Sequence, residues 1–365
     1  MTFNIKHFFA AGNTARGFTS LLHSSLQGIE RLFVIDGFPA DARQNLMQNS
    51  GSAVSGLGET LWMLHCASDP DSIDGWIAPG LKAGVVTGEA FRGLNTEVPG
   101  LAVQFIHLAE AVSEPASLEQ LQSEIDILNG AIKKLHEQAY AGFAEALRIH
   151  DEWEALYIEN MDFEAADRLT HEVIEALLGD RRKEKSSRVD HRFLGAATPK
   201  GSVDFVPNLT EGLKRYLVKG RAGSGKSTML KKIAAAAEDR GFDVEIYHCG
   251  FDPNSLDMII VREANFAIFD STAPHEYFPE YPGDEIIDTY ERCILPGTDE
   301  KYAEALAGFK ARYSAKMKES IGCLTKAKSH LDALKMIYDP FVDDFKIDDI
   351  KEELNWQIVQ GISPK

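Results

Sequence analysis

The sequence predicts an α/β protein made of two copies of one unit, each a parallel sheet with helices on both faces followed by a long helical arm. The first observation is a motif, His-Cys-x-x-Asp-Pro-x-Ser-x-Asp, that begins at His65 and returns 183 residues later at His248. The second is an order of short apolar runs and one helical run that is typical of strand–helix–strand units. The third is a heptad pattern in the second part of each unit.

The repeat divides the chain of 365 residues into two units. The same offset carries Gly37 onto Gly220 and Pro99-Gly100 onto Pro282-Gly283, and chance is a poor explanation for a register held this long. We expect a first unit over 1–184, with its α/β part over about 1–112 and its arm over about 114–180. The second unit is expected over 185–365, with its α/β part over about 190–296 and its arm over about 298–362. The polar run 180–187 is interpreted as a solvated linker.

The apolar runs predict the order of elements within each α/β part. In the first unit, strands are expected over 32–35, 61–64 and 84–86. In the second unit, a strand over 215–218 is followed by a helix over 227–239, rich in Ala, Lys and Leu, and by strands over 242–247 and 266–269. Strands separated by a helix of this length predict a parallel sheet with crossover helices.

The helical arms show apolar residues at heptad spacing. In the first arm these residues step by three and four from Leu118 to Leu156, and in the second Met317, Leu324, Leu331 and Tyr338 recur every seven residues. Such a seam indicates long helices packed as a coiled coil or a helical hairpin. An arm packed within the chain is favoured, and a homodimer or protein partner bound through the arms is the alternative.

Composition excludes several classes of protein. With 38 basic and 56 acidic residues, the net charge of −18 disfavours nucleic acid and anionic membranes as partners. No apolar run approaches the roughly 18 residues of a membrane span, and the first residues lack the apolar segment of a signal peptide. Four cysteines without a CxxC pair argue against a disulfide framework or a structural zinc site. We therefore expect a cytoplasmic protein.

One segment of the second unit fits the phosphate-binding pattern G-x-x-x-x-G-K-[ST]. Its residues are Gly220, Arg221, Ala222, Gly223, Ser224, Gly225, Lys226, Ser227 and Thr228. The glycines allow backbone N–H groups to approach phosphate oxygens, and the N-terminus of the following helix favours an anion. Lys226 is expected to reach the β- and γ-phosphates of ATP, and the Ser227 hydroxyl to ligate Mg²⁺.

A second carboxylate for the metal is expected from Asp270. It follows the four apolar residues 266–269, and a buried strand that ends in an aspartate beside the phosphate loop is the Walker B pattern. In the first unit the corresponding features are lost together: Gly223 and Gly225 become Ala40 and Ala42, Ser224 becomes Asp41, Lys226 becomes Arg43, Ser227 becomes Gln44 and Asp270 becomes Thr87. This joint loss indicates a retired nucleotide site, in which Arg43 retains at most a weak anion contact.

Further polar residues follow strands of the second unit. In the repeated motif, Asp252 or Asp257 is a candidate to orient water, to bind a phosphoryl acceptor or to hold Mg²⁺ through water, although a turn capped by Asp and Ser is the favoured interpretation. His248 and Cys249 are weak candidates for metal ligands. His275 and Glu276 are candidates for sensing the γ-phosphate or activating water. Arg221 and Arg262 are candidates for positive charge in the transition state.

These motifs, together with His7-x-Phe9, Thr14-x-Arg16-Gly17 and the segment 270–275, resemble an uncharacterised family of bacterial P-loop ATPase-like proteins with tandem, duplicated halves. The resemblance covers most of the chain, and it implies a duplicated P-loop NTPase-like fold that binds ATP at 220–228. The family's first half usually also carries an intact loop, and this sequence departs from that pattern at 37–43.

The favoured function is a Mg²⁺-dependent ATPase that hydrolyses ATP at a single site in the C-terminal half, with Lys226 and Asp270 as catalytic residues. The first alternative is a small-molecule or nucleotide kinase. The second is a nucleotide-gated interaction module with negligible turnover.

Overall fold

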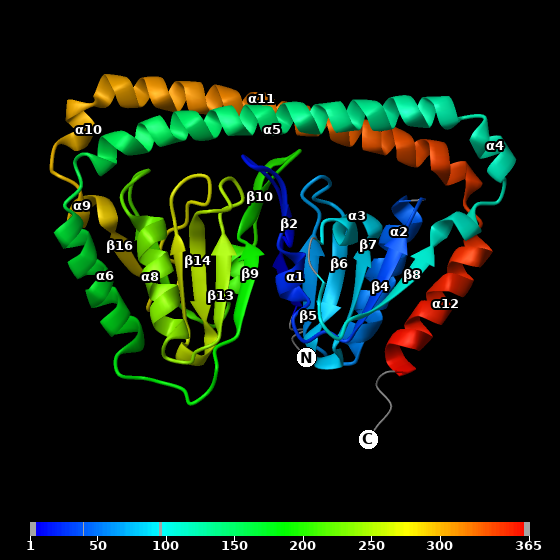
Figure 1. The fold of residues 1–365 in the computed structure, drawn as a ribbon, viewed down its shortest axis with the longest axis horizontal. Helices are drawn as coiled ribbons and strands as arrows, with labels where there is room; N and C mark the ends of the chain where they lie inside the picture. The colour runs from blue at the N-terminus through cyan, green and yellow to red at the C-terminus, as the bar shows by residue number, and fades with distance from the viewer. Residues whose placement is uncertain (1–4, 39, 95–96, 361–365) are drawn as a thin grey trace.

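The computed structural model describes residues 5–38, 40–94 and 97–360, which form two α/β units side by side beneath a pair of long helices (Figure 1). The first sheet contains β1 (Ile5–Phe8), β4 (Arg31–Asp36), β5 (Leu61–His65), β6 (Ile73–Ala78), β7 (Ala83–Thr87) and β8 (Ala102–His107). The second contains β9 (Val189–Phe193), β12 (Lys214–Lys219), β13 (Val244–His248), β14 (Leu256–Val261), β15 (Phe266–Asp270) and β16 (Glu285–Asp288). The orders β1-β5-β6-β7-β4-β8 and β9-β13-β14-β15-β12-β16 are equivalent, as the repeat predicts.

Both sheets are mixed, so the prediction of a parallel sheet is wrong for one strand of each unit. β6 is antiparallel to β5 and β7, and β14 is antiparallel to β13 and β15. The reason is the repeated motif, which forms a tight turn: Ser72 N–H donates to Asp69 O at 2.8 Å, and Ser255 N–H donates to Asp252 O at 2.9 Å. A turn this short reverses the chain and cannot make a parallel crossover.

Smaller strands and the helices complete each unit. Two hairpins pair β2 (Ala11–Thr14) with β3 (Gly17–Ser20) and β10 (Gly195–Thr198) with β11 (Gly201–Asp204). The helices are α1 (Leu22–Ser25), α2 (Ala40–Gly56), α3 (Gly88–Arg92), α4 (Pro115–Glu119), α5 (Gln122–Ile158), α6 (Phe163–Leu178), α7 (Val206–Leu209), α8 (Lys226–Glu238), α9 (Thr289–Cys293), α10 (Thr298–Lys301), α11 (Ala303–Tyr338) and α12 (Asp344–Gln360). Among the described residues, no helix combines the length and apolar character needed to cross a membrane.

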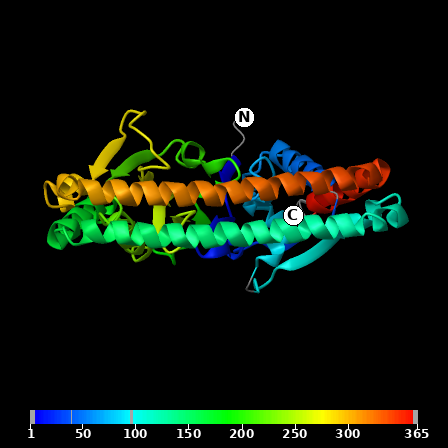
Figure 2. The ribbon, with the colours of Figure 1, turned by 90° about the horizontal axis from the view of Figure 1, so that it is seen from above.

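The two long arms pack against each other within the chain. α5 and α11 run antiparallel across the top of both units, and from above they lie side by side along the length of the molecule (Figures 1 and 2). Arg312 of α11 donates to Glu152 of α5 at 2.8 Å. Near the middle, Gly142 of α5 lies against Ser320 of α11. Leu324 of the second arm's seam shares an apolar cluster with Ala139 and Phe143 of α5, so the two arms pack on each other at this point.

The helices that follow the arms pack across the halves. Leu169 and Val173 of α6, from the first half of the chain, share a core with Met229 of α8 in the second unit. Leu354 of α12, near the other end of the chain, shares a core with Met47 of α2 in the first unit. The expected boundary at 184/185 divides the sequence repeat, whereas in space each unit receives its outer helix from the other half (Figure 1).

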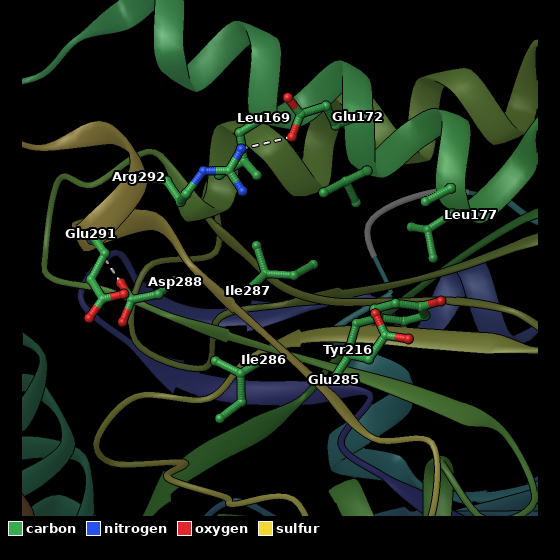
Figure 3. Close-up of a pocket in the computed structure, with 12 residues that line it drawn as sticks. Leu169, Glu172, Leu177, Tyr216, Glu285, Ile286, Ile287, Asp288, Glu291 and Arg292 are labelled. Carbon is green, nitrogen blue, oxygen red and sulfur yellow. Dashed lines mark hydrogen bonds and ion pairs between the residues drawn. The ribbon is translucent and has the colours of Figure 1, made fainter.

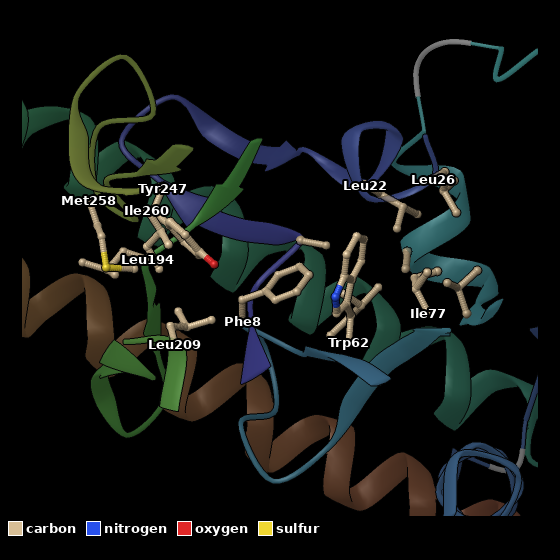
Figure 4. Packing of buried hydrophobic residues seen from close by; sticks show 14 of the residues in the cluster. Phe8, Leu22, Leu26, Trp62, Ile77, Leu194, Leu209, Tyr247, Met258 and Ile260 are labelled. Atoms are coloured by element: carbon tan, nitrogen blue, oxygen red, sulfur yellow. The ribbon is translucent and has the colours of Figure 1, made fainter. Parts of the chain in front are cut away.

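The two sheets meet edge to edge at β1 and β9. Phe193 N–H donates to Phe9 O at 3.0 Å, and one apolar cluster contains side chains of both units. Figure 4 shows Phe8 and Trp62 from the first unit packed toward Tyr247 and its neighbours from the second. The halves therefore share one apolar cluster at their junction.

The arm contact at Gly142 predicts a difference between two glycines of α5. A Cβ at Gly142 would overlap Ser320 Oγ and lie 3.3 Å from Ser320 Cβ, whereas a Cβ at Gly130 meets nothing within 4 Å. Gly142→Leu is expected to destabilise the fold by about 2 kcal/mol through overpacking, and Gly130→Leu to be neutral or stabilising. Chemical denaturation of both variants measures the difference, and equal stabilities would mean that the arms do not pack closely at Gly142.

Candidate functional site

A cavity of about 1350 Å³ lies at the top of the second sheet, beneath the arms. All nine residues of 220–228 line it, together with Asp257 and Asp270. The arms supply part of its other walls, including Glu154 and Tyr157 of α5 and Tyr313 of α11. The cavity thus brings together residues from both halves of the chain.

The loop 220–228 connects β12 to α8 and needs its glycines. Gly223 and Gly225 have φ values of +72° and +85°, a region that side chains with a Cβ rarely adopt. A Cβ at Gly220 would overlap Thr289 Oγ1 and lie 2.5 Å from Ser224 Oγ. The Ser224 hydroxyl donates to Arg221 O at 2.8 Å and holds the loop closed. The loop therefore presents backbone N–H groups at the N-terminus of α8.

Lys226, Ser227 and Asp270 meet in this cavity although Asp270 lies far away in sequence. β15 pairs in parallel with β12, with Asp270 opposite Val218, which places the carboxylate beside the loop. Lys226 Nζ is 3.6 Å from Asp270 Oδ2 and donates to Arg221 O at 2.8 Å. Ser227 Oγ accepts from Leu256 N–H at 3.0 Å. The arrangement combines a buried cation, a hydroxyl and a carboxylate.

A second polar group adjoins Asp270. Asp257, at the start of β14, is buried, and burial together with the nearby Asp270 charge raises the pKa of Asp257 to about 6. His275 Nδ1 lies 2.7 Å from Asp204 Oδ2. Burial alone would lower the pKa of His275, but the Asp204 hydrogen bond and the carboxylates of Asp257 and Asp270 raise it. Asp204 lies on the β10–β11 hairpin, and no local sequence pattern connects it with His275.

Of the remaining candidate residues in the second unit, some line the cavity and others do not. Asp252, Cys249 and Glu276 line the cavity. Burial raises the pKa of the Cys249 thiol, which disfavours the thiolate that a metal ligand requires.

Two other candidate residues, His248 and Arg262, make hydrogen bonds with neighbouring residues of the protein. His248 Nε2 lies 2.9 Å from His191 Nδ1, and its own Nδ1 lies 2.7 Å from Pro253 O. Arg262 donates to Glu245 at 2.7 Å and is not among the residues that line the cavity.

Sequence reasoning missed the arm residues that touch the loop. Gly223 N–H donates to Glu154 Oε1 at 3.2 Å. The Arg221 guanidinium donates to Asp299 Oδ2 of α10 at 2.9 and 3.1 Å, and Tyr157 OH donates to Asp299 Oδ1 at 2.7 Å. No spacing signal could reveal these contacts, because Glu154 and Tyr157 come from the first half of the chain and Asp299 lies 78 residues beyond Arg221.

In the first unit, the counterparts of the site residues bond to neighbouring groups of the protein. Arg43 donates to Gly37 O at 3.3 Å and pairs with Glu89 at 2.9 Å. The Gln44 amide bonds the backbone of Ile73, where Ser227 bonds Leu256 in the second unit. Thr87 caps α3 by accepting from Ala90 N–H. Pro39 lies outside the described residues.

A smaller pocket of about 410 Å³ lies apart from the loop, between α6 and the edge strand β16 (Figure 3). Its walls include Leu169, Ile286 and Tyr216, and Arg292 donates to Glu172 at 2.8 Å at its rim. None of 220–228 lines this pocket.

A scan against protein-family models, a search of curated proteins and a search of solved structures each found no match for this chain.

Proposed function

We propose that the second unit binds ATP with Mg²⁺ at 220–228 and hydrolyses it there, and that the first unit is a non-hydrolysing counterpart. The observation that carries this proposal is the convergence, in one cavity, of a glycine-rich loop at a helix N-terminus with Lys226 and Asp270, 3.6 Å apart. Backbone N–H groups, a helix N-terminus and a buried ammonium are groups that bind phosphate oxygens.

The residues that line the cavity fit both ATP and Mg²⁺. The left-handed conformations of Gly223 and Gly225 leave the loop without Cβ atoms where backbone N–H groups would meet phosphate oxygens. The Ser227 hydroxyl and the Asp270 carboxylate would hold Mg²⁺, which prefers oxygen ligands. When bound, Mg²⁺ would neutralise charge on the β- and γ-phosphate oxygens.

The protein's own residues supply the remaining roles in this proposal. Lys226 binds the phosphates and stabilises the charge that develops on them. Asp257 accepts a hydrogen bond from the attacking water and orients it, since its carboxylate is buried beside Asp270. His275, held by Asp204, donates a hydrogen bond to the γ-phosphate.

A phosphotransferase is the second candidate, and the size of the cavity favours it. About 1350 Å³ exceeds the roughly 300–1,000 Å³ of a typical small-molecule site, so an acceptor has room beside the nucleotide. Asp252 or Asp257 would then bind the acceptor rather than water.

Measurement of ATP binding and phosphate release, each with Mg²⁺, tests the proposal. We expect micromolar binding and phosphate release without an added acceptor. Loss of the γ-phosphate only in the presence of a pool of small metabolites would replace hydrolysis with phosphotransfer. Absence of ATP binding would overturn both candidates.

A further inference from the structure

We propose that the arm and the nucleotide compete for the same loop, so that ATP binding releases the end of α5 and the arm reports the occupancy of the site. This inference rests on the proposed function. Two carboxylates of the arms, Glu154 and Asp299, already engage the loop groups that phosphate oxygens would use.

The first contact is with the loop backbone. Glu154 Oε1 accepts from Gly223 N–H at 3.2 Å. The helix itself also lies close, because a Cβ at Gly223 would be 2.6 Å from Glu154 O. At Gly225 the neighbour is a side chain: the terminal methyl (Cε) of Met161, just beyond α5, lies 2.6 Å from the position of a Cβ. A phosphate oxygen at the Gly223 N–H therefore requires Glu154 to leave and the helix to shift.

The second contact neutralises the loop's guanidinium. Asp299 accepts two hydrogen bonds from Arg221, and Tyr157 of α5 donates to the other oxygen of Asp299. Arg221 also lies over the ring of Tyr290, 4.7 Å from its centroid. A bound triphosphate attracts Arg221 and repels Asp299, so the same ligand weakens this contact as well.

At the other end of the arm pair, on the first unit, the arm contacts are of a different kind. There Lys335 of α11 pairs with Asp41 at 3.2 Å and with Asp69 at 3.3 Å. Tyr338 stacks on Phe38 with ring centroids 4.4 Å apart. These are attractions between opposite charges and between rings, at a place where the glycine loop has been lost. On the first unit, therefore, these contacts of the arm pair do not occupy groups of a glycine-rich loop, whereas on the second unit Glu154 and Asp299 do.

Linkage makes the coupling reciprocal. Because arm docking and phosphate binding exclude each other at Gly223, weakening the docking must tighten nucleotide binding by the same factor. The hydrogen bond from Gly223 N–H to Glu154 is charge-assisted and half-exposed, and its loss corresponds to a change of about tenfold in the affinity for ATP. Glu154→Ala is expected to bind ATP about tenfold more tightly than the wild type.

The matched control is Glu145→Ala, which removes another carboxylate of α5. Glu145 pairs with Arg148 of its own helix and is not among the residues that line the cavity. The affinity of each full-length variant for ATP with Mg²⁺ is measured by calorimetry. Hydrogen exchange over residues 148–161 is measured with and without ATP as an independent report of arm docking.

We expect faster exchange over 148–161 when the wild type binds ATP, and faster exchange in Glu154→Ala even without ATP. Glu145→Ala should match the wild type in both measurements. If all three proteins bind ATP with one affinity and exchange is unchanged by ATP, the competition is refuted while the proposed function stands. If none binds ATP, the proposed function fails and this inference fails with it.

Discussion

Lys226→Ala is expected to lower the rate of phosphate release by about 10²–10³-fold, the loss typical when one preorganised donor to a developing charge is removed. Lys226 is nine-tenths buried, and its ammonium lies between the loop carbonyl of Arg221 and the carboxylate of Asp270. A buried ammonium stabilises the negative charge of a phosphate more strongly than an exposed one does, because little water competes for it. Steady-state phosphate release, with thermal unfolding to verify folding, measures the effect.

Arg43→Ala is the matched control, because Arg43 is the first unit's counterpart of Lys226. Its guanidinium already bonds Gly37 O and Glu89, so its loss should leave ATP binding and phosphate release within about twofold of the wild type. A large loss of ATP binding in Arg43→Ala would show that the first unit also holds nucleotide. An unchanged rate of phosphate release in Lys226→Ala would show that the loop takes no part in the reaction.

Glu245→Gln is expected to destabilise the fold by about 3 kcal/mol, near the lower end of the cost of breaking a buried ion pair. The Glu245 carboxylate bonds Arg262 at 2.7 Å and Arg192 at 3.1 Å, and it lies 3.4 Å from Lys6 of the first unit. Arg192 is fully buried and would lose one of its two carboxylate partners, keeping Asp190 at 3.2 Å. Urea denaturation at neutral pH measures the loss.

Glu172→Gln is the control, since Glu172 also pairs with an arginine, Arg292 at 2.8 Å, but is 60% exposed. Its expected cost is at most about 1 kcal/mol, and equal costs for the two variants would contradict the argument from burial.

The pH dependence of stability supplies a second measurement for Glu245. Burial alone would raise the pKa of Glu245, but Arg192, Lys6 and Arg262 hold it well below its usual value. Its contribution to stability is therefore present above the unfolded pKa of about 4.3 and is lost as the pH falls below it. The stability difference between wild type and Glu245→Gln should shrink in that acidic range.

Short-range patterns predicted the elements that depend on local sequence. The helix over 227–239 and the strand over 266–269 lie within one residue of α8 and β15. The antiparallel strands β6 and β14 were missed, although residues 258–261 of β14 form an apolar run directly after the turn motif. Strand direction depends on pairing between distant segments, and the turn residues of the motif were the available signal.

For the candidate site too, the sequence predicted the residues close together along the chain or on neighbouring strands, and missed the others. The residues of 220–228 and Asp270 share one cavity because a loop, a helix and two neighbouring strands dictate it. Glu154 could not be predicted, since it lies on α5, which reaches the second unit from the first half of the chain, and Asp299 could not, since it lies 78 residues beyond Arg221. His275 was singled out from its place after Asp270, but its partner Asp204 comes from a hairpin that the periodicity of the sequence did not reveal.

The exchange of outer helices has a consequence for the order in which the chain can fold as it is synthesised. α6 is made before the second sheet and is already present when α8 emerges, so the second unit can complete its core without delay. α2 of the first unit is made early, but Leu354 and Ile358, which cover it, come at the far end of the described chain. The N-terminal unit therefore leaves the ribosome first and is completed last, with the apolar face of α2 exposed to chaperones in between.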